Sequence, residues 1–564
     1  MRAWPGLCWR RMRLFRTLLS LLLVAAVQAA EPASHGLVAT VHPLASKAGL
    51  AVLKEGGNAV DAAIAAALTL GVVNGQNSGI GGGCFILIRR ANGALVAIDG
   101  RETAPAAATR EMFVRNGKAD TALSQTGALA SGVPGALAAY EYAVKHFGRK
   151  RFQQLILPAA ALAERGFDLD PDYAASLKSV ARDLARFPAS SAVFFRGGKL
   201  LAQGDTLRQA DLAATYRQVG EHGSAWFYRG PFAKAVDAWM RSNGGLIRAR
   251  DFRNYRVRIR EPIFSTYRGY QIVGFPPPSS GGVHVAEALN ILEQFDLKSL
   301  PDPVRVHVTA EAMKLVFADR AYWLGDPGFA RVPRGLVDKA YGLRLARQID
   351  LERAATVACQ GLPPRWPADI FGKHTTHISA ADAEGNWVAC TTTVNTSFGS
   401  KVIIPGTGVV LNNQMDDFSL QPGVTNAFGL VGAEANSVAA GKRPLSSMSP
   451  TIVLKNGQPL IALGAAGGPH IISTVLQELI DMLDLNLSPS ESVARARFHH
   501  QWFPDELLVE SRLPVQLRQA LAQRGHHLRE VSGLGVSQIV ARSPDGQSFV
   551  GAADPRANGN VAGW

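Results

Sequence analysis

The chain has 564 residues, of which 47% are apolar and 18% charged, and its formal net charge is +14 at pH 7. This is the composition of a globular protein with a large buried core. A nucleic-acid-binding protein would gather its Lys and Arg with aromatic residues in one stripe. Here the basic residues are scattered, so no nucleic-acid partner is expected, and an anionic small substrate or a polyanionic cell surface suits the charge better.

Residues 1–30 predict a secretory signal that is removed from the mature chain. An apolar run from Leu18 to Val27 is too short to span a bilayer comfortably, and small residues follow at Ala29 and Ala30. Cleavage is expected after one of these two alanines. Arg10-Arg11 could belong to a twin-arginine signal, but an ordinary basic leader explains the pair as well. The basic residues of this segment are Arg2, Arg10, Arg11, Arg13 and Arg16.

Residues 47–74 predict two helices that are broken at Gly56-Gly57. The apolar stretch from Ala59 to Val73 carries Asp61, so a buried helix is expected there and not a second membrane span. The glycine run that follows, NSGIGGGCFILIRR, leads into a strand. A phosphate loop has the opposite order, because it follows a strand and opens a helix. Close packing of backbones, or approach of the backbone to a substrate, is therefore expected.

Three cysteines lie beyond the signal segment, which itself holds Cys8. An odd number cannot all pair, and the chain does not resemble a disulfide scaffold. Cys84 and Cys390 lie in apolar, strand-like runs and are expected to be small core residues. Cys359 lies outside such runs, in the segment from Ala355 to His374.

The middle of the chain, from about residue 120 to 355, mixes amphipathic helices with short strands. PPPSSGGVH, from Pro276 to His284, predicts a rigid turn that feeds a helix. The segment from Ala355 to His374 has no periodicity and holds three prolines. It is expected to be exposed and to lie outside the core. A strand pattern begins directly after it, at Thr375.

A β-hairpin is predicted from residues 377–381 and 387–391, with a turn at 382–386. If the hairpin is centred on Glu384, Thr375 faces Thr393 across the two strands. Facing residues of antiparallel strands have Cβ atoms ~5 Å apart. Two threonine hydroxyls would then meet at one point, although a slip of one residue in register would separate them.

Thr375 has chemical meaning if the chain is cut directly before it. The new α-amine would have a pKa of about 7.7–8.0, so it could take the proton of the residue's own hydroxyl. Nucleophile and base would then come from one residue, and no Ser-His-Asp set around His377 would be needed. The ordinary alternative is that threonine is simply common in strands.

No metal site is expected from the histidines. His374 and His377 are three residues apart on a strand and would point to opposite faces. The adjacent pair His499-His500 would also diverge in a strand. No cofactor is expected either.

Nine motifs together resemble those of γ-glutamyltransferases, also called γ-glutamyltranspeptidases. They begin with GGNAVDAA, GIGGGCF, DGRETAP and PPPSSGGVH, and continue with Thr375-Thr376-His377, TTTVNTSFG, LNNQMDDFS, RPLSSMSPTIV and GAAGGPH. The resemblance covers essentially all of the chain after the signal segment. It implies an α/β (α+β) fold of the N-terminal-nucleophile hydrolase type, a four-layer αββα sandwich.

The resemblance also implies a precursor that cuts itself between His374 and Thr375. Residues 31–374 would form a large subunit and residues 375–564 a small subunit, and both would remain together in one αββα unit. Thr375 would be the nucleophile and Thr393 its partner hydroxyl. The expected location is the periplasm.

The family motifs imply a clamp for a free amino acid. Arg101 could hold an α-carboxylate with two parallel hydrogen bonds. The remaining clamp residues by resemblance are Ser446 and Ser447, which would add hydroxyl donors, and Asn395, Gln414 and Asp417, which would accept from or offset the α-ammonium. Gly467 and Gly468 would offer backbone amides to the oxyanion, and one such donor is typically worth ~3 kcal/mol of barrier.

Each of these residues also has an ordinary explanation. Asp417 could be a turn residue, Ser446-Ser447 a loop and Gly467-Gly468 a tight bend. The joint match of all motifs favours the site. Between Asp417 and Ser446 the family's members can carry a lid, in which some bacterial proteins have a tyrosine where this chain has Phe428. The ring could still gate the site, but the hydrogen bond of the tyrosine hydroxyl could not form.

The implied activity is transfer of the γ-glutamyl group of glutathione, or of a similar γ-glutamyl compound, through Thr375 to water or to an amino-acid or peptide amine. Two alternatives remain open from the sequence. One is a cephalosporin or glutaryl acylase, which resembles this family closely. The other is a non-catalytic periplasmic binding protein for glutamyl compounds, which would stay uncleaved.

Overall fold

The computed structural model describes residues 31–364 and 377–564, and two stacked antiparallel sheets form its centre. The first sheet has seven strands in the order β10-β3-β2-β14-β13-β1-β22. Its strands are β1 Gly36–Thr40, β2 Gly83–Arg89, β3 Leu95–Gly100, β10 Arg258–Arg260, β13 Ile378–Asp382, β14 Trp387–Thr393 and β22 Asn560–Gly563. Segments from both ends of the chain therefore share this sheet.

The second sheet has six strands in the order β11-β12-β15-β16-β20-β21. Its strands are β11 Ile263–Tyr267, β12 Tyr270–Gly274, β15 Thr451–Lys455, β16 Gln458–Ala466, β20 Val536–Arg542 and β21 Phe549–Ala553. Its inner face packs on the first sheet through an apolar layer. In that layer the rings of Phe85 and Phe275 stack at 4.2 Å between centroids. Phe85 lies on β2 of the first sheet, and Phe275 directly follows β12 of the second.

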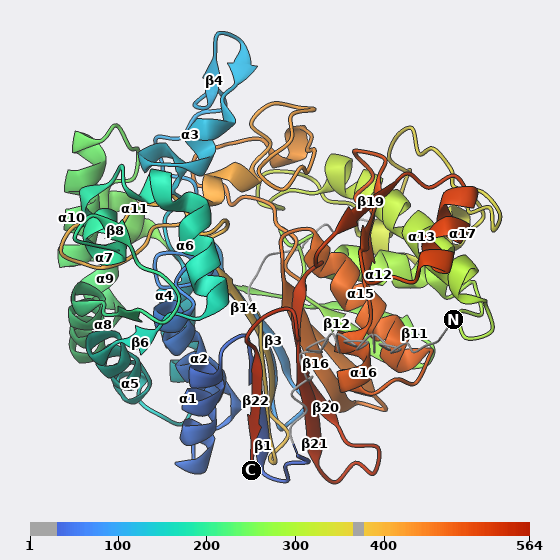
Figure 1. Cartoon of the computed structure of the whole chain (residues 1–564), viewed down its shortest axis with the longest axis horizontal. Coiled ribbons are helices and arrows are strands. Elements are labelled where there is room, and N and C mark those ends of the chain that lie inside the picture. Colours follow the sequence, from blue (N-terminus) through green and yellow to red (C-terminus); the bar gives the residue numbers. More distant parts are fainter. Residues whose placement is uncertain (1–30, 365–376) are drawn as a thin grey trace, which may run out of the picture.

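Helices cover the outer face of each sheet (Figure 1). The layer on the seven-stranded sheet contains α1 Pro43–Lys54, α2 Ala59–Val73, α4 Ala136–Phe147, α5 Phe152–Arg165, α6 Pro171–Leu184, α7 Pro188–Phe194, α8 Ala210–His222, α9 Ser224–Tyr228, α10 Pro231–Ser242 and α11 Ala249–Asn254. The layer on the six-stranded sheet contains α12 Gly281–Leu292, α13 Asp302–Trp323, α14 Lys339–Ala346, α15 His470–Leu483, α16 Pro489–Ala494 and α17 Val515–Gln523. The expected four-layer αββα arrangement is confirmed.

Smaller elements connect and extend these layers. A third sheet contains β17 Phe498–His499, β18 Leu507–Glu510 and β19 Leu528–Val531. The two-stranded pairs are β4 Val114–Arg115 with β5 Lys118–Ala119, β6 Phe167–Asp168 with β9 Thr206–Leu207, and β7 Phe195–Arg196 with β8 Lys199–Leu200. The short helix α3 spans Thr121–Gln125, and 3₁₀ turns span Ala128–Ala130, Arg334–Val337, Gln414–Asp417 and Glu434–Asn436.

The two N-terminal helices form as the sequence predicts. Helix α1 ends just before Gly56, whose φ of +84° lies in the left-handed region. Asn58 then caps α2, and the Asp61 side chain accepts from the Asn58 amide in return. Every residue of α2 is buried, including Asp61. Within the described residues, no helix is long and apolar enough to cross a membrane.

The glycine run before β2 lets backbones pack closely, as expected. A Cβ at Gly82 would lie 1.8 Å from the Thr393 carbonyl oxygen, and one at Gly81 would lie 2.0 Å from that of Val410. Neither position can hold a side chain without moving a neighbouring strand or loop. The run therefore fixes the end of β14, where Thr393 lies. Cys84 and Cys390 are buried, Cys359 is exposed, and all three are free thiols.

The hairpin of β13 and β14 has the predicted register within the described residues. Ile378 pairs with Cys390 and Ser379 with Ala389, which is the register centred on Glu384. Thr375 lies outside the described residues, so its pairing with Thr393 stays a prediction. Residues 355–364, before the expected cut, contain no helix or strand and none is buried, as predicted for an exposed segment.

Candidate active site

A pocket of about 620 Å³ opens where the ends of β14 and β16 meet the 3₁₀ turn at Gln414–Asp417. Predicted site residues from four separate stretches of sequence reach its wall: Thr393, Asn395, Asp417, Ser446, Ser447, Gly467 and Gly468. Arg101 and Gln414 do not line the wall but contact Asp417 from behind. The predicted nucleophile Thr375 lies outside the described residues.

Gly467 and Gly468 form the tight turn between β16 and α15. Their φ values are +129° and +59°, which side chains rarely adopt. A Cβ at Gly468 would lie 2.6 Å from the Phe428 ring, and one at Gly467 would lie 3.0 Å from the Cα atom of Gly535. Within the described chain, neither amide N–H donates to a protein acceptor. Both lie just before the positive end of α15 and are suited to an oxyanion.

Thr393 ends β14 with its hydroxyl directed by the next loop. The Asn395 amide donates to Thr393 Oγ1 at 2.8 Å, so the hydroxyl proton of Thr393 remains available for another acceptor. Asn395 holds a left-handed backbone with φ +82°. Its Nδ2 donates to the Asn413 carbonyl oxygen at 3.0 Å, which leaves its Oδ1 as an acceptor on the pocket wall.

Asp417 is the carboxylate on the pocket wall, and its side chain is 7% exposed. Its Oδ2 accepts from Arg101 Nη2 at 2.6 Å and from Gln414 Nε2 at 2.8 Å. Arg101 is fully buried, and its Nη1 also lies 3.4 Å from Glu102 Oε2. Arginine and acid therefore neutralise one another beside the pocket, and both could exchange partners with a zwitterionic amino acid.

Ser446 and Ser447 reach the pocket from a loop that the turn before α12 holds in place. The Ser446 carbonyl oxygen accepts from both the amide and the hydroxyl of Ser280, with the amide at 2.8 Å. The Ser446 amide in turn donates to the Pro278 carbonyl oxygen at 3.1 Å. The PPPSSGGVH motif thus has a definite role, because it fixes the backbone of the serine pair.

Phe428 covers the pocket beside the glycine turn. It lies in the stretch between Asp417 and Ser446 where a lid was expected, and Leu430 lines the pocket with it. Gln501 Nε2 donates to the carbonyl oxygens of Phe428 and Gly429 at 3.3 and 3.1 Å. His499 Nε2 lies 3.0 Å from Gln501 Oε1, which orients that amide. Gln501 thus attaches the backbone at Phe428 and Gly429 to the rest of the protein.

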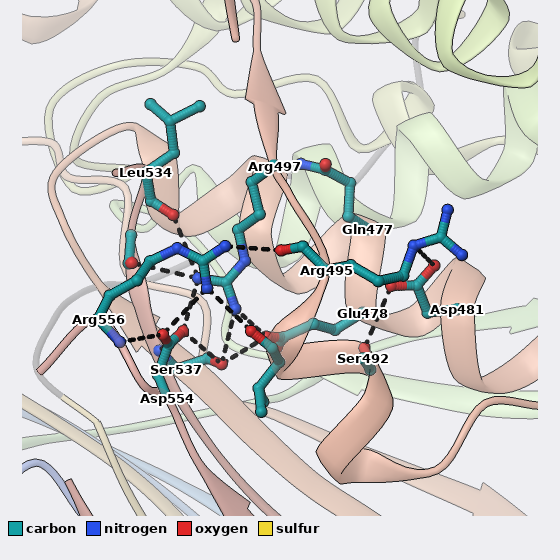
Figure 2. Close-up of polar contacts among 12 residues, drawn as sticks. Gln477, Glu478, Asp481, Ser492, Arg495, Arg497, Leu534, Ser537, Asp554 and Arg556 are labelled. Atoms are coloured by element: carbon teal, nitrogen blue, oxygen red, sulfur yellow. Dashed lines mark hydrogen bonds and ion pairs between the residues drawn. The ribbon is translucent and has the colours of Figure 1, made fainter. Parts of the chain in front are cut away.

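The loop at residues 532–535 contributes Ser532, Gly533 and Gly535 to the pocket wall, and a buried ion network holds it (Figure 2). Arg497 donates to the carbonyl oxygens of Leu534 and Gly535 at 3.2 and 3.1 Å. Arg497 is itself paired with Glu478 at 2.7 Å and with Asp554 at 2.6 Å. Because Gly535 packs against Gly467, this network supports the geometry of the glycine turn.

His377 is a buried, neutral core residue. Its ring nitrogens lie 3.2 Å from Thr391 Oγ1 and 2.7 Å from Ser379 Oγ, and no carboxylate is among these partners. Burial lowers its pKa to about 3. No acidic partner of His377 occurs within the described residues, in agreement with the sequence, which offered none for a Ser-His-Asp set.

Acid should destabilise the fold through His377. The unfolded side chain has a pKa of about 6.5, so below that pH the unfolded chain binds a proton that the folded chain excludes. The free energy of unfolding should fall by about 1.4 kcal/mol per pH unit between pH 6.5 and 3, with no contribution above 6.5. Denaturation midpoints measured below and above this limit should show a smaller pH dependence for His377→Gln than for the wild type. Equal slopes would contradict the assignment.

Within the described residues, one group of buried side chains has the composition of a metal site: His307, Glu311 and His526. His307 Nδ1 and His526 Nε2 lie only 2.7 Å apart, which is a direct hydrogen bond. Lys314 Nζ lies 2.9 Å from Glu311 Oε1, and the Ala355 amide donates to Glu311 Oε2. The histidines thus bond to one another, and Glu311 with Lys314 holds the segment at Ala355. The expectation of no metal stays a prediction.

Comparison with known proteins places this pocket in a family. The family described as gamma-glutamyltranspeptidase matches residues 45–564. The chain belongs to the γ-glutamyltranspeptidase family. It is 43% identical to a glutathione hydrolase proenzyme of Escherichia coli (strain K12), over 93% of this chain and 91% of that protein. It is 41% identical to an acylase ACY 1 proenzyme of Pseudomonas sp. (strain SE83), over 93% of each chain.

Among solved structures, the chain is similar to a cephalosporin acylase from Bacillus halodurans. The TM-score is 0.84 at 30% sequence identity, and the match covers 100% of this chain and 99% of the acylase. The chain is thus similar both to glutathione hydrolases and to acylases, and its structural neighbours share the α/β architecture of the N-terminal-nucleophile hydrolase type. The chain is an enzyme of this family, and its αββα layers agree with that fold.

Sequence reasoning missed some residues around the pocket. The wall residues Asn77, His470 and 532–535 belong to no motif that was assigned a role in the site, except that His470 ends GAAGGPH. Arg497 and Gln501 act on the pocket through carbonyl oxygens of distant loops. The charged residues of the network, Glu478, Arg497 and Asp554, are far apart in the sequence, so no local pattern indicates that they meet or what they hold.

Proposed function

We propose that the protein is a γ-glutamyltransferase and glutathione hydrolase that uses Thr375 as its nucleophile. Family membership and the glutathione hydrolase relatives support this activity. The observation that carries it is the wall of the pocket, where the Asp417 carboxylate lies in one cavity with the unused amides of Gly467 and Gly468. The α-ammonium of a γ-glutamyl donor would face Asp417, and the oxyanion that develops during the reaction would face the Gly467 and Gly468 amides.

The reaction would proceed in two balanced steps. Thr375 Oγ attacks the γ-carbonyl carbon of the donor while its α-amine takes the hydroxyl proton. The oxyanion forms against the Gly467 and Gly468 amides, the amide bond breaks, and the leaving amine receives the proton. Water or an amino-acid or peptide amine then attacks the γ-glutamyl ester and restores the Thr375 hydroxyl. Thr393 would donate to the nucleophile's oxygen.

The donor's amino-acid end would be held by the clamp. Arg101, with Ser446 and Ser447, would take the α-carboxylate, and Asp417 with Asn395 and Gln414 would take the α-ammonium. Arg101 lies behind Asp417 and pairs with it at 2.6 Å, so Arg101 would take the α-carboxylate only once this pair opens.

Maturation and export are part of the proposal. Residues 1–30 would direct the chain to the periplasm and be removed. The precursor would then cut itself before Thr375 into subunits of residues 31–374 and 375–564. Strands of both proposed subunits are interleaved in the seven-stranded sheet, where β1 of residues 31–374 lies between β13 and β22 of residues 375–564, so the cut pieces would remain together.

N-terminal sequencing of the purified protein, together with a γ-glutamyl anilide assay, tests this proposal. Two chains are expected, one beginning near residue 31 and the other at Thr375, with release of the aniline. A single intact chain without activity would support a binding protein in place of an enzyme.

An acylase is the second candidate, and the similarity to two acylases favours its consideration. A glutaryl group differs from a γ-glutamyl group by lacking the α-amine. Comparison of kcat/KM for γ-glutamyl and glutaryl anilides separates the candidates. The buried carboxylate on the wall predicts a preference for the γ-glutamyl donor, and a preference for the glutaryl donor would favour the acylase.

Arg101→Lys should weaken donor binding with little effect on self-cleavage. Lysine keeps the charge but loses the planar pair of donors. If the α-carboxylate is held equally in the ground and transition states, KM for glutathione should rise by about tenfold while kcat changes little. Steady-state kinetics of the two-chain protein give both values. An unchanged KM would remove Arg101 from the clamp.

A further inference from the structure

Arg320 is a buried arginine beside the proposed substrate pocket, near the end of α13. Its residue exposure is 5%. Nε donates to Ser280 Oγ at 3.1 Å and Nη2 donates to Ser447 Oγ at 3.3 Å. No carboxylate in the described parts of the chain forms an ion pair with its guanidinium. Its polar partners are therefore two serine hydroxyls, one of which lines the pocket.

Such an environment is unusual for an arginine, because buried charges are normally paired. Burial lowers the pKa of Arg320 to about 10, and the Asp417 charge opposes that shift. Arg320 therefore remains a cation at neutral pH. Arg101 differs from it, since Arg101 has Asp417 and Glu102 as ion-pair partners. Of these two cations, Arg320 is the one whose charge has no direct acidic partner.

The hydrogen bonds of Arg320 determine where the nearby hydroxyl protons point. A serine hydroxyl that accepts from a guanidinium must direct its own proton elsewhere. The Ser280 hydroxyl donates to the Ser446 carbonyl oxygen. The Ser447 oxygen accepts from Arg320, and its own proton has no protein acceptor within the described residues. Because Ser447 lines the pocket, that proton is available to a ligand there.

We propose that Arg320 positions and polarises Ser447, so that the Ser447 hydroxyl donates a hydrogen bond to the α-carboxylate of the γ-glutamyl substrate. The positive charge of Arg320 also offsets this carboxylate. The inference rests on the proposed function and adds a specificity-determining residue to it. Arg320 braces both halves of the serine pair, Ser446 through Ser280 and Ser447 directly. Asp417 and Glu102 both pair with Arg101. The Arg320 charge, which has only serine hydroxyls as direct partners, is therefore the one available to offset the α-carboxylate.

A pair of donors isolates this role. A 4-aminobutyryl anilide is a γ-glutamyl anilide without its α-carboxylate, and it keeps the amine and the scissile bond. Arg320→Gln should lower kcat/KM for the γ-glutamyl anilide by about tenfold or more, the effect of losing a hydrogen bond to a charged group. The same variant should change the 4-aminobutyryl reaction by less than about threefold, since that donor offers no carboxylate. The ratio of the two donors is the decisive quantity.

Two further variants control this experiment. Arg320→Lys keeps the charge but cannot bond both serines, so its ratio should lie between those of the wild type and Arg320→Gln. It also preserves the test if Arg320→Gln does not fold. Arg305→Gln removes an arginine of the same helix that bonds the carbonyl oxygens of Leu297 and Leu300. The donor ratio of this variant should equal that of the wild type.

The outcomes are distinct. A fall confined to the γ-glutamyl donor supports the role of Arg320. An equal fall for both donors would reduce Arg320 to a brace of the loop, and unchanged rates would remove it from the site; both overturn the inference. A wild-type protein that acts on neither anilide, or prefers a glutaryl anilide, would overturn the proposed function as well.

Discussion

Replacing Thr375 with alanine is expected to leave one uncleaved chain with no transferase activity. The proposed self-cleavage requires the Thr375 hydroxyl to attack the carbonyl carbon of His374, and alanine has no hydroxyl. The same loss removes both the nucleophile and, because no new N-terminus forms, the α-amine that would act as its base. A denaturing gel and a γ-glutamyl anilide assay measure the two effects.

Thr375→Ser is the matched control for this prediction. Serine retains the hydroxyl and can gain an α-amine, so this variant should still divide into two chains and retain measurable activity. Appearance of two chains from Thr375→Ala would place the cut elsewhere or assign it to a separate protease. An uncleaved Thr375→Ser chain would show that more than a hydroxyl is needed at this position.

Local sequence patterns predicted the parts of the fold that local chemistry determines. The turn predicted at 382–386 implied a register between β13 and β14, and the pairing of Ile378 with Cys390 confirms it. The order of the glycine run excluded a phosphate loop, and the structure shows the expected close backbone contacts. The four layers were not visible in any pattern and followed from the family resemblance, because strand order depends on contacts between distant segments.

The site, too, was predictable only in part from the sequence. Motif matches identified Asp417, Gly467 and Gly468, and the structure brings them to one pocket. They could not reveal that Arg101 already pairs with Asp417, since more than three hundred positions separate the two in the chain. Arg320 was missed for a related reason. A single arginine in a helical segment has no sequence signal that distinguishes a buried cation from a solvated one.

The structure also shows that two residues without an informative sequence context support loops at the pocket. Arg497 supports the loop at 532–535 through carbonyl oxygens, and a carbonyl has no sequence signature. Gln501 holds the lid in the same manner. The missing tyrosine hydroxyl at Phe428 therefore does not leave the lid unsupported, because the backbone of this stretch is held from the other side.

Asp417→Asn should change the donor preference of the enzyme by more than about a hundredfold. Asparagine keeps the shape and an acceptor oxygen but removes the charge that would face the α-ammonium. A buried charge pair broken on one side costs roughly 3–5 kcal/mol, and about 1.4 kcal/mol corresponds to a tenfold change. kcat/KM for a γ-glutamyl anilide should fall accordingly, whereas a glutaryl anilide, which lacks the amine, should react at a similar or higher rate.

Asp416→Asn provides the matched control, because Asp416 is the neighbouring buried acid and does not line the pocket. Its side chain accepts from the Ser124 hydroxyl and the Ala427 amide, so its loss should disturb local structure without changing the donor ratio. Self-cleavage of Asp417→Asn should be normal, since the peptide before Thr375 offers no ammonium. If Asp417→Asn lowered both donors by one factor, Asp417 would serve only to hold Arg101, and the acylase alternative would gain support.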